Sequence, residues 1–199
     1  MKAGVFGGTF DPVHIGHLAM AERVRCELKL DRVIFVPANV SPFKSDQLNS
    51  SGKHRLAMVR LAIQGNDYFA VSEAELQRGG TSYTVDTMEL FSQENPEAEF
   101  FFIMGMDSIW ELNGWKDVDR LAELCQLVVV TRPGYEIQSD RLCELGLSQL
   151  VWDRTCFLEV PGLEIAARDL RQRVKNNQSV RYLLTPEVEE YIRKNDLYR

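Results

Sequence analysis

The stretch AGVFGGTFDPVHIGHLAMAERVRCEL, residues 3–28, decides the fold prediction. It opens with a short apolar run, Ala3–Phe6, passes through Gly7 and Gly8, and ends in residues whose apolar members recur at helical spacing. A strand that enters a helix through a glycine turn is a typical start of a parallel α/β sheet, in which ligands bind beyond the carboxyl ends of the strands. The turn after the first strand is therefore the first candidate site.

The rest of the chain repeats this alternation of strands and helices. Apolar runs of strand length follow at 33–36, 69–71, 100–104, 127–131 and 156–160. Helical patterns lie at 14–28, 53–64, 84–93, 117–125, 139–145, 167–176 and 186–195. The order predicts an α/β fold with a mostly parallel sheet and helices on both faces. We expect one domain over residues 1–199, in which 165–199 form a C-terminal helical segment.

Composition and charge exclude several classes of protein. The 199 residues are 45% hydrophobic and 26% charged, which is typical of a globular chain. The net charge of −6 argues against a general nucleic-acid binder, and no apolar run approaches the ~20 residues of a membrane span. No signal peptide is evident, so we expect a cytoplasmic protein without nucleic-acid or membrane partners. A homo-oligomer is left open. The four cysteines form no CxxC pair and are predicted to be buried, reduced thiols.

The turn after the first strand has the features of an anion site. Asp11 is predicted to cap the following helix, with Pro12 in its first turn. His14 and His17 are three residues apart, so they share one face near the positive end of the helix dipole. Gly16 between them removes a side chain that would block access. The residues alone leave three readings open: an anion site, ordinary packed histidines, or a metal pair for which no third zinc ligand is evident.

The same stretch, GGTFDPVHIGH, resembles the (H/T)xGH signature of the nucleotidylyltransferase superfamily. The chain is most similar to the nicotinate mononucleotide adenylyltransferases of bacterial NAD synthesis. The likeness continues through VPANVSPFK (36–44), SEAELQRGGTSYTVDT (72–87), FFIMGMDSIWELNGW (101–115), VVVTRPGY (128–135) and LLTPEVEEYIRKNDLY (183–198). Pantetheine-phosphate adenylyltransferases and some aminoacyl-tRNA synthetases share the histidine motif alone, so the ordered combination carries the specificity.

The resemblance implies a Rossmann-like fold and a defined reaction. ATP and nicotinate mononucleotide would give nicotinate adenine dinucleotide and pyrophosphate, with Mg²⁺ bound mainly through the ATP phosphates and no protein metal ligand. A phosphate monoester has a second pKa near ~6, so the acceptor is already largely ionised at neutral pH. The enzyme then needs no nucleophile or strong base of its own. It has to position the substrates in line and neutralise charge on the phosphates.

The resemblance also assigns residues to roles. The catalytic residues would be His17, His14, Lys44 and Arg171. His17 would contact the α-phosphate, and His14 would bind neighbouring phosphate oxygens. ATP binding would involve Gly8, Thr9, Phe10, His14, His17, Lys44, Asp107, Arg132, Ala167, Arg168 and Arg171. Nicotinate mononucleotide binding would involve Thr9, Phe10, Tyr83, Thr84 and Trp115.

Each of these residues also has an ordinary structural interpretation. Lys44 would be a surface lysine, and Asp107 would cap the short helix that follows it. Thr84 and its neighbour Tyr83 would cap another helix, and Trp115 would be a core residue. We favour the binding roles because the motifs occur together and in order.

Two departures from the family pattern lie on the triphosphate side. The family motif ISSTxIR corresponds to Ile165–Arg171, where Ala166, Ala167 and Arg168 replace the hydroxyl residues and Arg171 is retained. Phe43 stands where the family commonly has histidine. Two alternatives to the leading interpretation stay open, and only the second is supported by these changes. One is the same chemistry on nicotinamide mononucleotide or another phosphorylated acceptor, and the other is a nucleotide-binding regulator with weakened catalysis.

Overall fold

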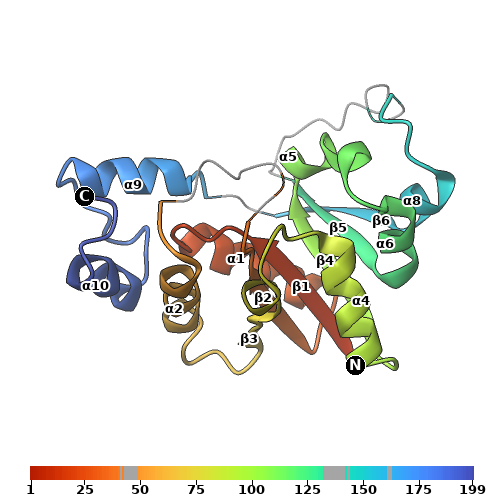
Figure 1. The fold of residues 1–199 in the computed structure, drawn as a ribbon, viewed down its shortest axis with the longest axis horizontal. Coiled ribbons are helices and arrows are strands. Elements are labelled where there is room, and N and C mark those ends of the chain that lie inside the picture. The colour runs from red at the N-terminus through yellow and green to blue at the C-terminus, as the bar shows by residue number, and fades with distance from the viewer. Residues whose placement is uncertain (41, 43–48, 132–141, 143, 161–162) are drawn as a thin grey trace.

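A parallel sheet forms the centre of the molecule (Figure 1). The computed structural model describes residues 1–199 except 41, 43–48, 132–141, 143 and 161–162. The six strands are ordered β3-β2-β1-β4-β5-β6, and each neighbouring pair is parallel. Their bounds are β1 Lys2–Gly8, β2 Arg32–Pro37, β3 Phe69–Val71, β4 Glu99–Gly105, β5 Gln126–Thr131 and β6 Thr155–Glu159. The predicted α/β, Rossmann-like fold is confirmed.

The apolar runs form strands because helices cover the sheet on both faces. In β4 every residue from Phe100 to Met104 is buried. Phe101 and Ile103 belong to the hydrophobic cluster on one face, whereas Phe102 and Met104 belong to the cluster on the other. Consecutive apolar positions are therefore needed, as expected for a parallel strand.

The longer helices lie close to their predicted ranges. They are α1 Ile15–Glu27, α2 Gly52–Ala62, α4 Thr84–Glu94, α6 Val118–Leu124, α9 Ala167–Lys175 and α10 Pro186–Lys194. The structure adds the short elements α3 Ala74–Arg78, α5 Met106–Ile109, η2 Leu112–Gly114 and α8 Gln149–Asp153. Such short helices show little periodicity in a sequence. The predicted helix at 139–145 falls largely outside the described residues.

The helices divide between the two faces of the sheet (Figure 1). Helices α1, α2, α9 and α10 bury residues in the cluster on one face, whereas α4, α5, α6 and α8 do so on the other. Helix α10 packs beside α2, where the His54 ring nitrogen Nδ1 lies 3.0 Å from the Tyr191 hydroxyl. The single domain with a helical segment from 165 stays a prediction.

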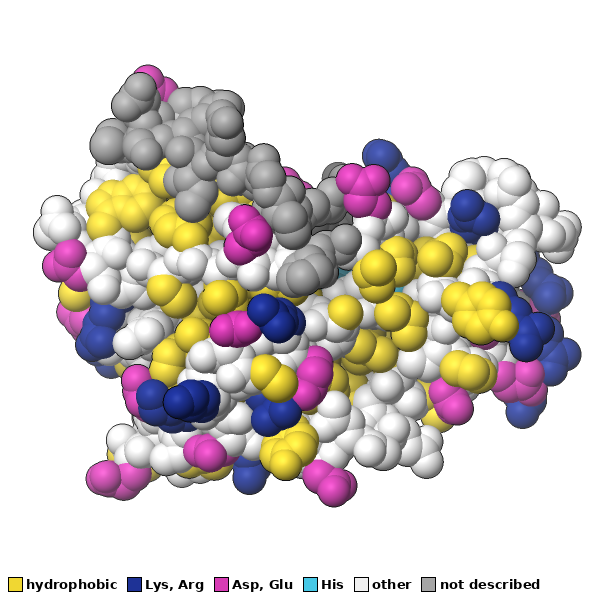
Figure 2. All heavy atoms as spheres, turned by 180° about the vertical axis from the view of Figure 1, so that it is seen from behind, with side chains coloured by type: hydrophobic (Ala, Val, Ile, Leu, Met, Phe, Trp, Pro, Cys, Tyr) yellow, Lys and Arg dark blue, Asp and Glu magenta, His cyan; other side chains and the backbone are white. Residues whose placement is uncertain are grey.

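Basic residues gather around α9. Figure 2 shows Lys and Arg side chains at the end of the molecule that α9 and α10 form, and Arg168, Arg173 and Lys175 are exposed there. No helix within the described ranges is long and apolar enough to cross a membrane.

The thiol prediction was partly wrong. Cys125 is buried, and burial raises its pKa to about 12, but Cys26 is exposed on the outer side of α1. Cys156 is half-buried and Cys143 lies outside the described residues. Cys26 follows the apolar spacing of α1 but does not face the core. Its sulfur contacts the charged side chains of Glu22 and Arg25 instead.

Candidate active site

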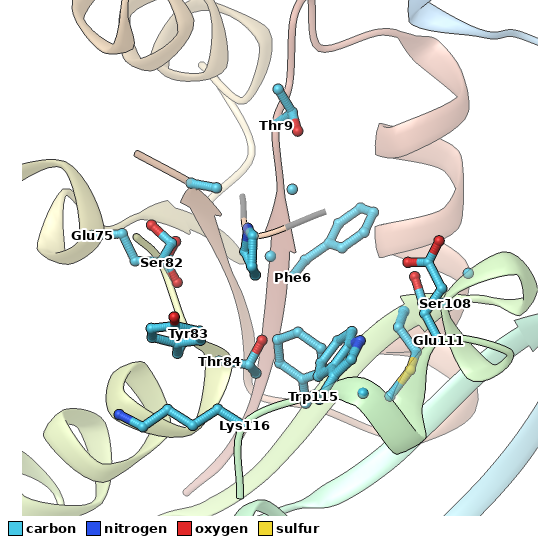
Figure 3. Close-up of a pocket in the computed structure, with 18 residues that line it drawn as sticks. Phe6, Thr9, Glu75, Ser82, Tyr83, Thr84, Ser108, Glu111, Trp115 and Lys116 are labelled. Carbon is cyan, nitrogen blue, oxygen red and sulfur yellow. The ribbon is translucent and has the colours of Figure 1, made fainter. Parts of the chain in front are cut away.

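A cavity of about 400 Å³ opens at the carboxyl ends of β1 and β4 (Figure 3). Strands β2 and β3 follow β1 on one side of it, whereas β4, β5 and β6 follow on its other side. The direction in which strands are added therefore reverses between β1 and β4. Such a switch point is where open parallel sheets bind ligands. The lining consists of Phe6, Gly7, Gly8, Thr9, Ala38, Pro42, Glu75, Ser82, Tyr83, Thr84, Phe102, Met104, Gly105, Ser108, Glu111, Gly114, Trp115 and Lys116.

The glycine turn forms one wall of this cavity. Gly8 and Thr9 line it, as predicted. A Cβ atom on Gly8 would lie 2.9 Å from the ring of Phe10, which folds back beneath the turn with a φ of 49°. Phe10 does not line the cavity, because its side chain is buried in the core against Phe6 and Phe35. Its ring supports the turn from below.

The opposite wall combines the start of α4 with the segment after η2. Tyr83 is the N-cap of α4 and Thr84 its first residue, so the predicted helix start is confirmed. The Tyr83 side chain makes no capping hydrogen bond to this helix. The first N–H groups of a helix attract anions when they are left open. Figure 3 shows Thr84 between Tyr83 and Trp115 on this wall, and the Trp115 ring is edge-on to Phe102 at a centroid distance of 5.8 Å.

Trp115 is more than a core residue. Its ring lines the cavity, and its indole Nε1 atom is buried without a hydrogen-bond partner among the described residues. A buried N–H group is usually paired, so an unpaired one at a cavity wall fits a ligand contact. The cavity thus brings together Thr9, Tyr83, Thr84 and Trp115, four of the five residues predicted for the acceptor.

The two histidines form a stacked pair at the start of α1. Their ring centroids are 3.6 Å apart, and the backbone N–H of His14 donates to Nδ1 of His17 at 3.2 Å. His14 is only 7% exposed, and burial lowers its pKa to about 4, so the ring is neutral at pH 7. Its Nδ1 atom is buried with no partner in the part of the chain that the structure describes. The shared face is confirmed.

Gly16 lies against the side chain of His14. A Cβ atom on this residue would lie 3.1 Å from Nδ1 of His14. The glycine therefore makes room for the His14 ring, which packs over the first turn of α1. The first helical N–H, that of Ile15, donates to the carbonyl of Leu183 at 3.0 Å. The anion site predicted here therefore lacks that donor.

The predicted cap of α1 was wrong, and so was the alternative interpretation of Asp107 as a helix cap. Helix α1 begins at Ile15 with His14 as its N-cap, so Asp11 does not cap it and Pro12 is not in its first turn. The Asp11 carboxylate instead accepts hydrogen bonds from residues distant in sequence. Asp107 lies inside α5, whose N-cap is Gly105. It is exposed and does not line the cavity.

Arg171 lies next to the histidine turn although it is distant in sequence. Its Nη1 atom donates to the backbone carbonyl of Asp11 at 2.7 Å. Ala167 is the first residue of α9, and Arg168 is exposed beside Asp169 at 3.9 Å. Lys44, Phe43 and Arg132 lie outside the described residues.

Sequence analysis missed a fully buried arginine behind the cavity. Arg55 has no exposed surface, and its guanidinium donates to the carbonyls of Thr9 at 2.8 Å and Asn39 at 3.1 Å. Burial lowers the pKa of this group, while the charge of Asp11 opposes the shift. Asn39 in turn donates its N–H to the Ser82 hydroxyl at 2.9 Å. Arg55 thus links the glycine turn to the segment before α4.

A buried carboxyl group was also missed. Glu75 lines the cavity behind Ser82 (Figure 3) and is 7% exposed. Burial raises its pKa, whereas hydrogen bonds from Thr87 and Ser82 and the charge of Arg78 lower it. Thr87 donates to Glu75 at 2.7 Å and accepts from Arg78 at 3.1 Å, so this group holds α3 against the first turn of α4. No short-range pattern in the sequence predicts that Glu75 is buried.

Comparison with known proteins assigns the family. Residues 5–187 match the cytidylyltransferase-like family model. The "Probable nicotinate-nucleotide adenylyltransferase" of Moorella thermoacetica is 45% identical over 199 residues, which cover all of this chain and 92% of the relative. The chain belongs to the nicotinate-nucleotide adenylyltransferase family. The protein of the same name from Bacillus licheniformis is 41% identical, covering 99% of this chain and 98% of the relative. The family resemblance seen in the sequence is confirmed.

Solved structures support the fold of this adenylyltransferase family member. The Plasmodium falciparum nicotinic acid mononucleotide adenylyltransferase complexed with NaAD matches with a TM-score of 0.78 at 16% identity, covering 99% of this chain and 97% of that one. The same enzyme complexed with APC matches with a TM-score of 0.77, also at 16% identity, over 99% and 96% of the two chains. At this identity the match concerns the fold alone.

Proposed function

We propose that this chain transfers the adenylyl group of ATP to nicotinate mononucleotide, giving nicotinate adenine dinucleotide and pyrophosphate, a step of NAD biosynthesis. The observation that carries the proposal is the cavity at the switch point of the sheet. One wall holds the glycine turn of the histidine motif, and the other holds the start of α4 and Trp115. A single cavity therefore has one end suited to phosphates and another suited to an aromatic ring.

The reaction needs positioning more than protein chemistry. A phosphate oxygen of the acceptor attacks the α-phosphorus of ATP, and the bond from that phosphorus to the bridging oxygen breaks. The bonding electrons leave with pyrophosphate. Because the acceptor phosphate is largely ionised at neutral pH, no side chain has to remove a proton. Alignment of the reacting atoms and neutralisation of the developing charge lower the barrier.

On the ATP side, His17 contacts the α-phosphate and His14 the neighbouring oxygens. A neutral His14 can donate one N–H to a phosphate oxygen. Lys44 and Arg171 add positive charge near the triphosphate. Arg171 already donates to the Asp11 carbonyl, so its remaining N–H groups are the ones that can reach the nucleotide.

ATP is held further by Gly8 and Thr9 in the turn, which the buried ring of Phe10 supports from below. Asp107, Arg132, Ala167 and Arg168 complete the proposed ATP set. The exposed Asp107 carboxylate on α5 would accept a ribose hydroxyl. Ala167 opens the nine-residue helix α9, whose backbone amides bind an anion without the hydroxyl side chains that this chain lacks.

On the acceptor side, the pyridine ring stacks on Trp115 and its carboxylate meets the open N–H groups at the start of α4. Both oxygens of a carboxylate can accept hydrogen bonds from such N–H donors. An amide has one oxygen, so it presents an NH₂ group to the second donor. An unpaired buried polar group costs roughly 1–3 kcal/mol. The site should therefore favour nicotinate over nicotinamide mononucleotide.

Mg²⁺ fits this site as a substrate-borne ion. Over the described residues no group of three or more His, Cys, Asp or Glu side chains could hold a metal. In nucleotide enzymes Mg²⁺ often binds through one or two carboxylates plus the substrate phosphates. The ATP phosphates would supply most of its ligands here, and it would supply charge neutralisation. A cytoplasmic location and the absence of nucleic-acid or membrane partners stay predictions from the sequence.

The test is pyrophosphate release from ATP with each candidate acceptor, at fixed Mg²⁺. Nicotinate mononucleotide should give a kcat/KM at least about tenfold above that of nicotinamide mononucleotide. Equal use, or preference for the amide, would assign the same chemistry to a different acceptor. ATP binding without pyrophosphate release on either would favour the regulator.

A further inference from the structure

The carboxylate of Asp11 connects the histidine turn to the last residues of the chain. It is 2% exposed and accepts three hydrogen bonds. The donors are the backbone N–H of Asn49 at 2.8 Å, the Ser50 hydroxyl at 2.5 Å and the Tyr198 hydroxyl at 2.6 Å. A buried carboxylate is stable only when donors surround it. Donors from two distant parts of the chain, residues 49–50 and Tyr198, therefore meet at the Asp11 side chain.

Tyr198 is held in place for this contact. It is the penultimate residue, with a left-handed φ of 65°, and its ring packs against the cluster that includes Met58. A non-glycine residue persists in that region only where its surroundings fix it. Burial and the neighbouring Asp11 carboxylate raise the pKa of the Tyr198 hydroxyl, so it stays protonated and donates.

Asp11 is also connected to the groups proposed to act on ATP. Its backbone carbonyl accepts from Arg171 at 2.7 Å. Three residues further on, the ring of His14 stacks on that of His17 at 3.6 Å. A shift of Asp11 would therefore move all three of these side chains. The acceptor wall lies apart from this group, because Tyr83 and Trp115 pack against the cluster on the other face of the sheet.

We infer that Tyr198 is a positioning residue for adenylyl transfer: by bonding the Asp11 carboxylate, it fixes His14, His17 and Arg171 against the ATP phosphates. The inference rests on the proposed function. Without the hydroxyl, Asp11 keeps two of its three donors and gains freedom to shift. Small displacements of groups that align reacting atoms cause large losses of rate.

The test replaces one hydroxyl group with hydrogen. Tyr198→Phe keeps the ring and its packing, and Tyr191→Phe is the matched control. Tyr191 also lies near the C-terminus and also loses a contact, to His54 at 3.0 Å, but it does not touch Asp11. We expect Tyr198→Phe to lower kcat/KM for ATP about tenfold and to leave KM for nicotinate mononucleotide within about twofold. Tyr191→Phe should keep both values, with the melting temperature measured for each.

Three outcomes would overturn the inference. The first is equal kinetics for the two variants. The second is an equal rise in KM for both substrates, which indicates general loosening of the fold. The third comes from combining Tyr198→Phe with Asp11→Asn. If Tyr198 acts through Asp11, the double variant is no slower than Asp11→Asn alone, so fully additive losses would contradict the route.

Calorimetric titration with ATP and Mg²⁺ separates this inference from the proposed function. If the unmodified protein binds ATP but releases no pyrophosphate with nicotinate mononucleotide, the proposed function fails. The inference is then judged on binding, where Tyr198→Phe should weaken the affinity for ATP about tenfold and Tyr191→Phe should not. Unchanged ATP affinity in both variants would refute it.

Discussion

Replacing His14 by glutamine should make the protein less sensitive to acid. The folded protein holds the pKa of this buried imidazole at about 4, whereas the unfolded chain has the ordinary value of 6.5. Between these values the unfolded state binds a proton that the folded state does not. Stability from this residue is therefore fully present above pH 6.5 and is lost as the pH falls toward 4.

The magnitude follows from the width of that window. Each pH unit inside it removes about 1.4 kcal/mol of unfolding free energy. Between pH 6.5 and roughly pH 5, His14 should therefore reduce the stability by about 2 kcal/mol. Glutamine has no charge to gain, so His14→Gln should lose about 2 kcal/mol less than the unmodified protein over the same interval, whatever its stability at neutral pH.

Urea unfolding at about pH 7.5 and pH 5 measures this difference. The other acid-sensitive groups are common to both proteins, so they cancel when the two pH dependences are subtracted. Val24→Ala is the matched control in the same helix. Val24 has no exposed surface, so its truncation should lower stability by a similar amount at both pH values. An identical pH dependence in His14→Gln and the unmodified protein would refute the assignment to His14.

Three further variants test the proposed roles by pyrophosphate release. His17→Ala should stay folded, with an unchanged circular dichroism spectrum, and lose roughly 10²–10³ in rate; near-normal kcat would contradict its role. Arg171→Ala should raise KM for ATP more than Arg173→Ala does, because Arg173 donates to the Ser179 carbonyl, at 3.3 Å on the surface; equal effects would indicate a general effect of positive charge and not a specific phosphate contact. Trp115→Ala should weaken both mononucleotides about tenfold through lost stacking and keep their ratio; a large change in the ratio would contradict this.

The central strands β4 and β5 were predictable because burial on both faces gives each of them a continuous apolar run, and the half-buried edge strands β3 and β6 keep shorter apolar runs. This signal is local, and nothing elsewhere in the chain is needed to interpret it. The longer helices were predictable for the same reason, since one turn after another repeats the apolar spacing. Helix α5 has only four residues, Met106–Ile109, and offers no repeat to detect.

The failed predictions share a different cause. Asp11 has the right chemistry and position for a helix cap, yet its carboxylate accepts from Asn49, Ser50 and Tyr198 instead. Arg55 sits in a helix of ordinary amphipathic appearance, and only the folded chain supplies the Thr9 and Asn39 carbonyls that allow its burial. In both cases the partner is distant in sequence, so no local pattern reports it.

The topology separates the two halves of the site and so makes them independently variable. In the proposed function, the turn after β1 and α9 would bind the phosphates, whereas the start of α4 and the segment after β4, which line the cavity, would bind the acceptor. Arg55 and Asn39 connect the two halves. Arg55 donates to the carbonyls of Thr9 and Asn39, and Asn39 donates to the Ser82 hydroxyl. Substitutions at Ser82–Thr84 or Trp115 can therefore change the acceptor without moving the histidine pair. The departures at Ala166–Arg168 lie wholly in the other half, so they should affect the handling of ATP and leave the choice of acceptor unchanged.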